Sequence, residues 1–306
     1  NNTLEIVWSA IPAVVMTFLV VKGLVAWNDT MADVGPDEEV IEIEATGYQF
    51  AWHLRYPGPD GILGQRDYKQ ITATNPLGQV WSDEKNLDDI HPSEIVLPVN
   101  KKVRVRITSR DVLHNFYLPH FRVKMDAVPG LPTYFVFTPT QTTAEYREKL
   151  SQYPEYNQPK DPEDPDSPLL WEEYNYELAC AELCGSSHFA MRRIVRIVTE
   201  EEYEDWLSTQ NSYYMSSIRG SDSDPFREEV LSIEVAQRRE DFVTEVESLL
   251  ASEGEEMILE LKYINFETGS ANLTEDSKYE VDYAAALMKQ YPDLNFELGG
   301  HTDDTG

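Results

Sequence analysis

"VIEIEATGYQFAWHLRY", residues 40–56, alternates apolar and polar side chains over much of its length. A two-residue period is typical of a β-strand with one buried face. The same alternation returns in "SEIVLPVNKKVRVRITS" (93–109), "LPTYFVFTPT" (131–140) and "RRIVRIVTE" (192–200), with Pro and Gly clusters between these stretches. The region from about residue 40 onward is therefore predicted to form an antiparallel β-sandwich or a small barrel.

Helical spacing begins where the strands end. Tyr203, Trp206 and Leu207 recur at helical steps and predict a helix that closes the sandwich domain, whose bounds we place at 40–207. Residues 208–255 are highly charged and are predicted to form an acidic helical linker. Its apolar residues recur at three- and four-residue steps or their sums: Phe226, Val230, Ile233, Phe242, Val246 and Leu249.

The residues before the sandwich are mostly apolar, as in "LEIVWSAIPAVVMTFLVVKGLVAW" at 4–27. A helix of roughly 20 apolar residues is long enough to cross a bilayer. Trp8 and Trp27 lie where interfacial aromatic residues usually lie. A signal peptide fits less well, because the run is long, contains Pro12 and is followed by no small-residue cleavage pattern. We therefore expect residues 1–28 to be a transmembrane helix.

The charge of the chain restricts its partners. It carries 55 acidic residues against 25 basic ones, a formal net charge of -30. Such a surface repels nucleic acid and attracts basic partners, so nucleic-acid binding is excluded. The sequence has no Cys-x-x-Cys-His motif, so it carries no covalently attached c-type haem.

Both cysteines of the chain lie in "ACAELCGSSHFAM", residues 179–191. Cys180, Cys184, His188 and Met191 have the spacing C-x3-C-x3-H-x2-M, and the sandwich supplies a distant histidine, His114. A disulfide is one interpretation, although it would close a short loop and stabilise little.

Two interpretations of this segment involve a metal. A tetrahedral zinc site with two cysteines and two histidines is possible, although neither zinc nor a disulfide gives Met191 a role. Thiolates and a thioether beside imidazoles favour copper, and a second thiolate suggests two bridged metal ions. His53, His91 and His120 are expected to be surface or packing residues instead.

Several segments together resemble cytochrome c oxidase subunit II over residues 1 to about 207. "LEIVWSAIP" is similar to the start of that family's second transmembrane helix, and "ATGYQFAWHLRYP" to its aromatic segment. "SRDVLHNFYLPHFRVKMDAVPG" and "CAELCGSSHFAM" resemble its two copper-binding segments. The resemblance implies a membrane-anchored, mainly β protein with a cupredoxin-like Greek-key sandwich.

The resemblance also implies a dinuclear copper centre, CuA. Cys180 and Cys184 would bridge both copper ions, and His114 and His188 would bind one ion each. The remaining two ligands would be the Met191 thioether and the main-chain carbonyl of Glu182. The Glu182 carboxylate would in addition bind magnesium at the interface with the catalytic subunit, since carboxylates suit that cation. Nitrous oxide reductase has a similar spacing, but typically an aromatic residue at position 182 and a large propeller domain, which this chain lacks.

Two further roles follow from the same resemblance. Phe50 and Trp52 match the aromatic pair that receives the electron from cytochrome c, although the first position is commonly tryptophan. Phe50 is either a tolerated aromatic substitution or a sign that the donor is a c-type cytochrome complex held permanently beside this subunit. Glu5 matches a glutamate at the start of a proton-uptake pathway; alternatively, it stabilises the helix N-terminus.

The function implied is that of the CuA subunit of a bacterial haem-copper cytochrome c oxidase. The chain would be anchored in the inner membrane with its soluble domains in the periplasm. It would accept electrons from cytochrome c, or a resident c-type cytochrome complex, and pass them to haem in catalytic subunit I. That subunit would reduce oxygen and pump protons together with other oxidase subunits. The alternative is an envelope tether whose cysteines form a disulfide or bind structural zinc.

The last residues, 256–306, follow a strand, helix, strand pattern, with Thr274 capping the helix. "INFETGSANL" and "GGHTDDTG" resemble the first half of an OmpA-like peptidoglycan-binding domain. Asp303 would match the aspartate that holds the peptidoglycan peptide. The arginine-containing helix of the second half is absent from this sequence, so we expect only a partial module.

Overall fold

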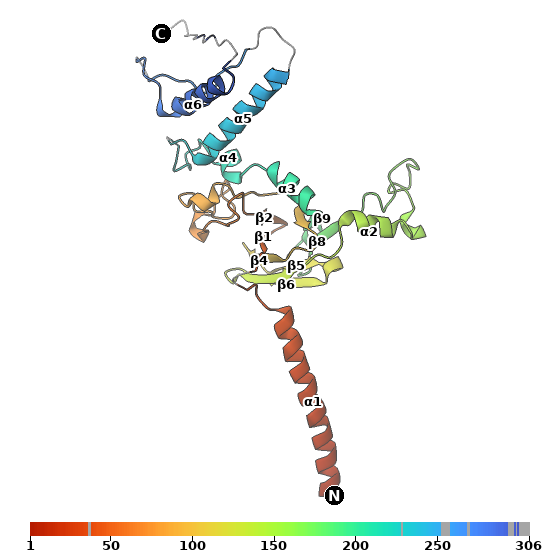
Figure 1. The fold of residues 1–306 in the computed structure, drawn as a ribbon. Helices are drawn as coiled ribbons and strands as arrows, with labels where there is room; N and C mark the ends of the chain where they lie inside the picture. Colours follow the sequence, from red (N-terminus) through yellow and green to blue (C-terminus); the bar gives the residue numbers. More distant parts are fainter. Residues whose placement is uncertain are drawn as a thin grey trace. The chain divides into compact units, whose positions relative to one another are not determined.

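The computed structural model describes residues 1–35, 38–227, 229–251, 258–267, 270–292, 297 and 299. These residues form two compact units, Asn1–Ser223 and Asp224–Gly306. The first unit contains helix α1 (Asn2–Thr30) and all the strands β1–β9, which lie together in one body in Figure 1.

Two sheets make up the sandwich. The four-stranded sheet has the order β2-β1-β4-β7, with bounds Ala51–Arg55, Ile41–Tyr48, Val103–Ser109 and Thr133–Phe137. The five-stranded sheet has the order β3-β9-β8-β5-β6, with bounds Ile95–Pro98, Arg192–Val198, Tyr176–Cys180, His114–Leu118 and Val123–Ala127. The stretch 40–56 thus forms a hairpin, whose strands β1 and β2 are joined by Gln49 and Phe50.

The prediction of an antiparallel sandwich was wrong for two strand pairs. Strand β1 runs parallel to β4, and β3 runs parallel to β9. Alternation shows which side chains face the core, but it carries no information about the direction of the neighbouring strand. Long connections separate the members of both pairs in the chain, and parallel pairing requires such crossovers.

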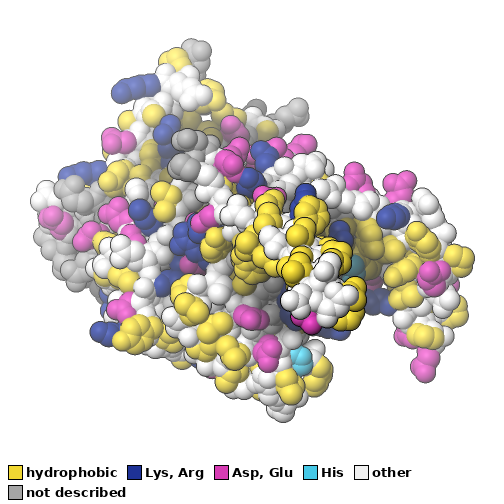
Figure 2. Space-filling view, turned by 90° about the horizontal axis from the view of Figure 1, so that it is seen from below, with side chains coloured by type: hydrophobic (Ala, Val, Ile, Leu, Met, Phe, Trp, Pro, Cys, Tyr) yellow, Lys and Arg dark blue, Asp and Glu magenta, His cyan; other side chains and the backbone are white. Residues whose placement is uncertain are grey.

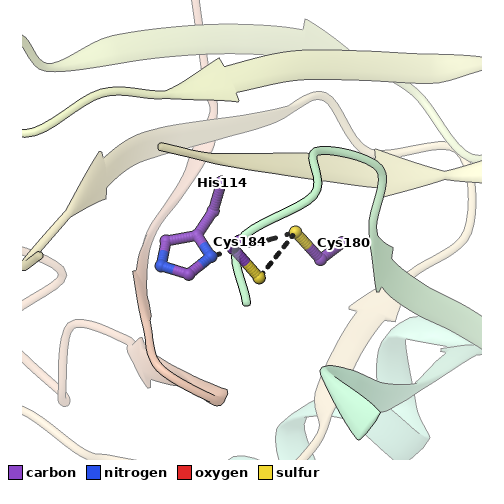
Figure 3. Close-up of side chains that lie close together, drawn as sticks. All are labelled: His114, Cys180 and Cys184. Carbon is purple, nitrogen blue, oxygen red and sulfur yellow. Dashed lines mark hydrogen bonds between the residues drawn. The ribbon is translucent and has the colours of Figure 1, made fainter. Parts of the chain in front are cut away.

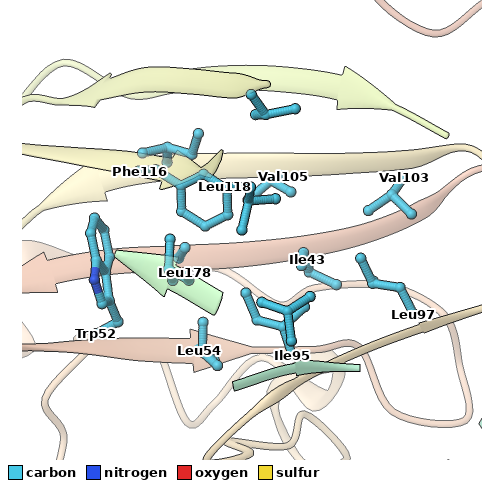
Figure 4. Packing of buried hydrophobic residues seen from close by; sticks show 14 of the residues in the cluster. Ile43, Trp52, Leu54, Ile95, Leu97, Val103, Val105, Phe116, Leu118 and Leu178 are labelled. Atoms are coloured by element: carbon cyan, nitrogen blue, oxygen red, sulfur yellow. The ribbon is translucent and has the colours of Figure 1, made fainter. Parts of the chain in front are cut away.

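The core lies between the sheets and follows the predicted alternation (Figure 4). On β4, Val103, Val105 and Ile107 are fully buried, whereas Arg104 and Arg106 reach the surface. Burying one such aliphatic side chain contributes about 1.5–3 kcal/mol. The ends of the strands are thereby fixed, and the segments that carry the predicted metal ligands are attached to these ends.

Helix α3 (Glu200–Ser208) closes the sandwich as predicted. It begins with a capping box between Thr199 and Glu202, which satisfies main-chain donors of its first turn. Trp206 packs edge-on against Tyr56 with ring centroids 5.4 Å apart. Tyr203 and Leu207 pack on the same core. Helix α2 (Thr143–Leu150) contributes Leu150 to the buried residues of this unit.

Residues beyond the predicted boundary at 207 also pack on this unit. Helix α4 (Tyr213–Ser217) places Tyr214, which is fully buried, against Trp81. Nearby, Arg55 is fully buried and donates hydrogen bonds to Asp89 and Glu44. The compact unit therefore extends to Ser223, and only the later part of residues 208–255 belongs to the second unit.

Helix α1 is 29 residues long, and none of its residues is buried. Its length and hydropathy are sufficient to cross a membrane. Figure 2, viewed from the end where α1 lies in Figure 1, shows a dense group of hydrophobic side chains. Glu5 lies in the first turn of the helix and is exposed.

The second unit contains helices α5 (Ser232–Ala251) and α6 (Glu275–Gln290). Phe242 and Val246 of α5 are buried, and Phe242 packs against Tyr283 of α6. Helix α6 begins after Thr274, as predicted, although the Thr274 side chain makes no capping hydrogen bond. The strand predicted before α6 was wrong for the described part of 256–273, where pairing is limited to an isolated bridge between Phe266 and Leu273.

Candidate metal centre

The predicted ligands come from two neighbouring strands and one loop. His114 is the first residue of β5, and Cys180 is the last residue of β8. These strands are antiparallel neighbours with Phe116 opposite Cys180, so both ligands lie at the same end of the sheet. The loop from β8 to β9 then carries Cys184, His188 and Met191.

The two thiols lie near each other without forming a disulfide. Their Sγ atoms are 3.9 Å apart, and both cysteines are free and buried. A disulfide bond would require about 2.05 Å. The His114 Nδ1 atom lies 3.9 Å from the Cys180 Sγ atom, and Figure 3 shows the three side chains gathered together. These three side chains bring their ligand atoms within 4.8 Å of one another.

The remaining predicted donor atoms gather around the same two sulfur atoms. The His188 Nδ1 atom lies 3.5 Å from the Cys184 Sγ, and the Met191 Sδ atom lies 3.3 Å from it. The main-chain carbonyl oxygen of Glu182 lies 3.2 Å from the Cys180 Sγ. Each thiol therefore has its own imidazole and one further weak donor.

This donor set fits copper better than zinc. Two metal–thiolate bonds of about 2.3 Å, the length known for zinc, span up to about 4.6 Å, so one metal ion could contact both sulfur atoms. The set holds more donors than a tetrahedral zinc ion uses, and two thiolates with a thioether are soft ligands. Burial, and then the neighbouring Cys180, raise the pKa of the Cys184 thiol to about 11. Metal binding must therefore displace a proton.

Asp111 holds one of the predicted ligands and was missed by the sequence reasoning. Its Oδ1 atom lies 2.8 Å from the His114 Nε2 atom, while its Oδ2 atom accepts a hydrogen bond from the Gln49 main-chain N–H at 2.7 Å. Burial alone would raise the pKa of Asp111, but hydrogen bonds from Gln49 and His114 lower it below its usual value. A charged carboxylate there favours a proton on Nε2 and leaves Nδ1 free to bind a metal.

The hairpin of β1 and β2 packs closely on the ligands because two glycines allow it. A Cβ atom at Gly47 would lie 2.9 Å from the His114 Cδ2 atom. A Cβ at Gly185 would lie 2.8 Å from the Phe50 Cε1 atom. Phe50 thus covers the cysteine loop, while Trp52 is buried with its ring centroid 6.1 Å from that of His114.

Three histidines outside the ligand set pack against tyrosines. His53 stacks on Tyr48 and His91 on Tyr213, with ring centroids 4.2 and 4.1 Å apart. Burial is the main cause that lowers the pKa of His53 to about 4 and that of His91 to about 3. His120 lies among several tyrosines. The structure gives all three packing roles, as the sequence analysis expects.

Three other predicted residues do not join this cluster. The side chain of Glu182 is exposed, although its carbonyl faces the site. Glu5 lies on α1. Asp303 and most of "GGHTDDTG" lie outside the described residues. Their predicted roles remain predictions.

A two-sheet sandwich that gathers cysteine, histidine and methionine donors at one end of a sheet defines a cupredoxin-like metal-binding domain. Residues 41–148 match the family described as cytochrome c oxidase subunit II, periplasmic domain. This part of the chain is therefore similar to the periplasmic domain of cytochrome c oxidase subunit II.

Two curated relatives and one solved structure show the extent of the similarity. The chain is 34% identical over 215 residues to an alternative cytochrome c oxidase subunit 2 of Bradyrhizobium diazoefficiens, covering 70% of this chain and 65% of the relative. It is 27% identical to a probable cytochrome c oxidase subunit 2 of Rickettsia felis, covering 71% and 56%. The crystal structure of the periplasmic domain of a Bradyrhizobium japonicum subunit II is 26% identical, covering 57% of this chain and 96% of that domain, with a TM-score of 0.35. The chain thus spans less than two thirds of the length of these curated relatives.

Proposed function

We propose that this chain is the electron-accepting CuA subunit of a bacterial haem-copper cytochrome c oxidase. The observation that carries the proposal is the pair of free, buried thiols 3.9 Å apart, each facing its own imidazole. Structural zinc does not need the Met191 thioether, which lies 3.3 Å from the Cys184 sulfur. A site with two copper ions, which prefer soft ligands, would use all of these donor atoms.

The ligand roles follow the geometry around each sulfur atom. The thiolates of Cys180 and Cys184 and the imidazoles of His114 and His188 would hold the two copper ions. Met191 and the Glu182 carbonyl would be the weak ligands. Bound copper would supply a reversible one-electron acceptor.

The protein's own residues would keep the site rigid and dry. His114 and Met191 are each 1% exposed, so little solvent needs to rearrange when the charge of the site changes. Asp111 holds the tautomer and orientation of His114. The electron would arrive through Phe50, which covers Gly185, or through Trp52 beside His114. The net charge of -30 suits a basic donor, either cytochrome c or a resident c-type cytochrome complex.

The cysteine loop also offers a surface for the catalytic subunit. Leu183 and Phe189 are 81% and 78% exposed although both are large and apolar, which is typical of a surface that contacts another protein. The exposed carboxylate of Glu182 beside them would bind magnesium at that interface. Haem in catalytic subunit I would accept the electron, and oxygen reduction and proton pumping would occur there.

The remaining assignments concern the envelope. Helix α1 would anchor the chain in the inner membrane with the sandwich in the periplasm, and Glu5 would lie at the start of a proton-uptake pathway. The OmpA-like segment, residues 256–306, would bind peptidoglycan, with Asp303 holding the peptide.

Metal analysis with a visible spectrum of the purified chain tests the proposal. We expect a pair of copper ions per chain and a coloured protein, and we expect Cys184→Ser to abolish the spectrum, because each metal loses a soft ligand. Ser186→Ala, in the same loop, is the matched control and should keep the colour. A single zinc ion per chain, or a quantitative Cys180–Cys184 disulfide, would instead support the envelope tether.

A further inference from the structure

We propose that Gln49, in the turn between β1 and β2, is a positioning residue that braces the two ligand-bearing segments of the metal centre. The inference rests on the proposed function because copper binding is one way to measure its effect. The brace itself consists of contacts within the chain. Gln49 belongs to the hairpin of the four-stranded sheet, whereas the ligands belong to the five-stranded sheet and its loop.

The first contact of the brace reaches the His114 segment. The Gln49 main-chain N–H donates to the Asp111 Oδ2 atom at 2.7 Å. The other oxygen of that carboxylate lies 2.8 Å from the His114 Nε2 atom, and it also accepts a hydrogen bond from the Val112 N–H at 2.7 Å. Asp111 is thus fixed on one side by the hairpin and on the other by its own loop, which leaves the His114 ring little freedom to rotate.

The second contact reaches the cysteine loop. The Gln49 side-chain amide donates from Nε2 to the main-chain carbonyl of Cys184 at 2.6 Å. The next residue, Phe50, covers Gly185, so the turn holds the loop by one hydrogen bond and one packing contact at adjacent residues. Gly185 has a φ of +138°, a conformation that favours glycine, so the loop could not carry a side chain under this ring.

A brace is needed because pairing between β5 and β8 ends before the loop begins. The last contacts along these strands are the pairing of Phe116 with Cys180 and the hydrogen bond from the Ala181 N–H to the Asn115 carbonyl. Cys184 lies beyond them, outside the ladder. Its distance from His114 is therefore set by contacts such as those of Gln49, which lies between the two segments without touching a ligand donor atom.

The brace should control two measurable properties of the loaded site. A loop that is less firmly held lets the Cys184 sulfur move relative to Cys180, which changes the reduction potential and the spectrum. It also lets metal escape more easily. A neutral hydrogen bond contributes about 1 kcal/mol, so its loss corresponds to roughly a five-fold faster release of copper.

The experiment uses the full chain in detergent with Gln49→Met, which keeps the length of the side chain and removes the amide, and Gln49→Glu, which keeps the shape and removes the donor. Because Gln49 is exposed, neither change leaves a cavity in the core. Gln152→Met, at an exposed glutamine of the turn after α2, is the matched control. Copper content, reduction potential, visible spectrum and the rate of copper loss to a chelator are measured for each protein.

We expect both Gln49 variants to bind copper to the same stoichiometry as the unmodified chain, with a shifted potential, an altered spectrum and faster copper loss. The control should match the unmodified chain. An unchanged potential, spectrum and release rate in both Gln49 variants would overturn the brace while leaving the copper assignment in place.

A second measurement separates this inference from the proposed function. Hydrogen exchange of the main-chain amides from Cys184 to His188 is followed in the metal-free chain. Faster exchange in Gln49→Met than in the unmodified chain supports the brace even if the unmodified chain binds no copper, an outcome that would refute the proposed function alone. Equal exchange in the two proteins counts against the brace.

Discussion

Acidification should destabilise this fold through His91. Its ring stacks on Tyr213 with an interplanar angle of 19°, and its Nε2 atom is buried with no hydrogen-bond partner in the described part of the chain. Burial first, and then the positive charge of Arg55, lower the pKa of His91 from 6.5 to about 3. The folded protein therefore holds this imidazole neutral at pH values where an unfolded chain would protonate it.

The size of the effect follows from the difference between the two pKa values. The stability contribution is present above the unfolded pKa of 6.5 and is lost as the pH falls toward the folded pKa of about 3. About pH 5 lies roughly 1.5 units below the pKa of this histidine in the unfolded chain, which therefore binds a proton that the folded chain does not. Each unit corresponds to about 1.4 kcal/mol, so the folded state loses about 2 kcal/mol of stability. His91→Phe keeps a stacking ring and cannot titrate, so it should remove this part of the pH dependence.

Urea unfolding of the metal-free chain, followed by tryptophan fluorescence at about pH 7 and about pH 5, measures the effect. The comparison is between proteins, because the 55 acidic residues also change their protonation over this range. The unmodified chain should lose about 2 kcal/mol more than His91→Phe on acidification. Tyr213→Phe keeps both the ring and the histidine and should behave as the unmodified chain. Equal losses in the unmodified chain and His91→Phe would refute the reasoning.

Three further results are expected. Arg55→Met should lower the free energy of urea unfolding by about 3–5 kcal/mol, because Asp89 and Glu44 lose a buried cation, and a loss below about 1 kcal/mol would contradict this. Met191→Leu should retain copper but shift the reduction potential measured by redox titration, because an axial thioether tunes the metal more than it holds it; an unchanged potential would argue against Met191 as a ligand. If the donor is a resident c-type cytochrome complex, gentle extraction should co-purify it and Phe50→Trp should change oxidase turnover little, whereas an oxidase that needs only soluble cytochrome c, with rates falling steeply as salt rises, would contradict the resident donor.

Alternation along the chain was enough to locate β1, β4, β7 and β9, because the residues that pack in or on the core recur at every second position of these strands. It could not give strand direction, which depends on the path of the connections. The closing helix was predictable from Tyr203, Trp206 and Leu207, whereas the packing of α4 was not, because its residues give no periodic signal of their own. Phe226 and Val230 were counted in the helical spacing of the predicted linker 208–255, but α5 begins only at Ser232, so both residues precede it.

The sequence likewise predicted some residues of the candidate metal centre and missed others. The spacing of Cys180, Cys184, His188 and Met191 placed four residues together because Cys180 ends β8 and the other three lie in the loop that follows it. Asp111 and Gln49 were missed, because both lie in turns and act through contacts with residues distant in the sequence or in their own loop, which no periodicity marks. The signal that could have found Asp111 is its position three residues before His114, since a carboxylate often orients a metal-binding histidine.

The position of β3 has a consequence for the biogenesis of the protein. β3 is an edge strand whose neighbour in the sheet is β9, so Ile95 pairs with Val195, a hundred residues later in the chain. A nascent chain emerges from its N-terminus and cannot complete this sheet until residue 198 has been made. Both cysteines emerge before that strand, while the sandwich that will bury them is still incomplete. Under the proposed function, a finished and buried metal site would exist only after β9 has been made, so loading of that site would follow synthesis of the strand.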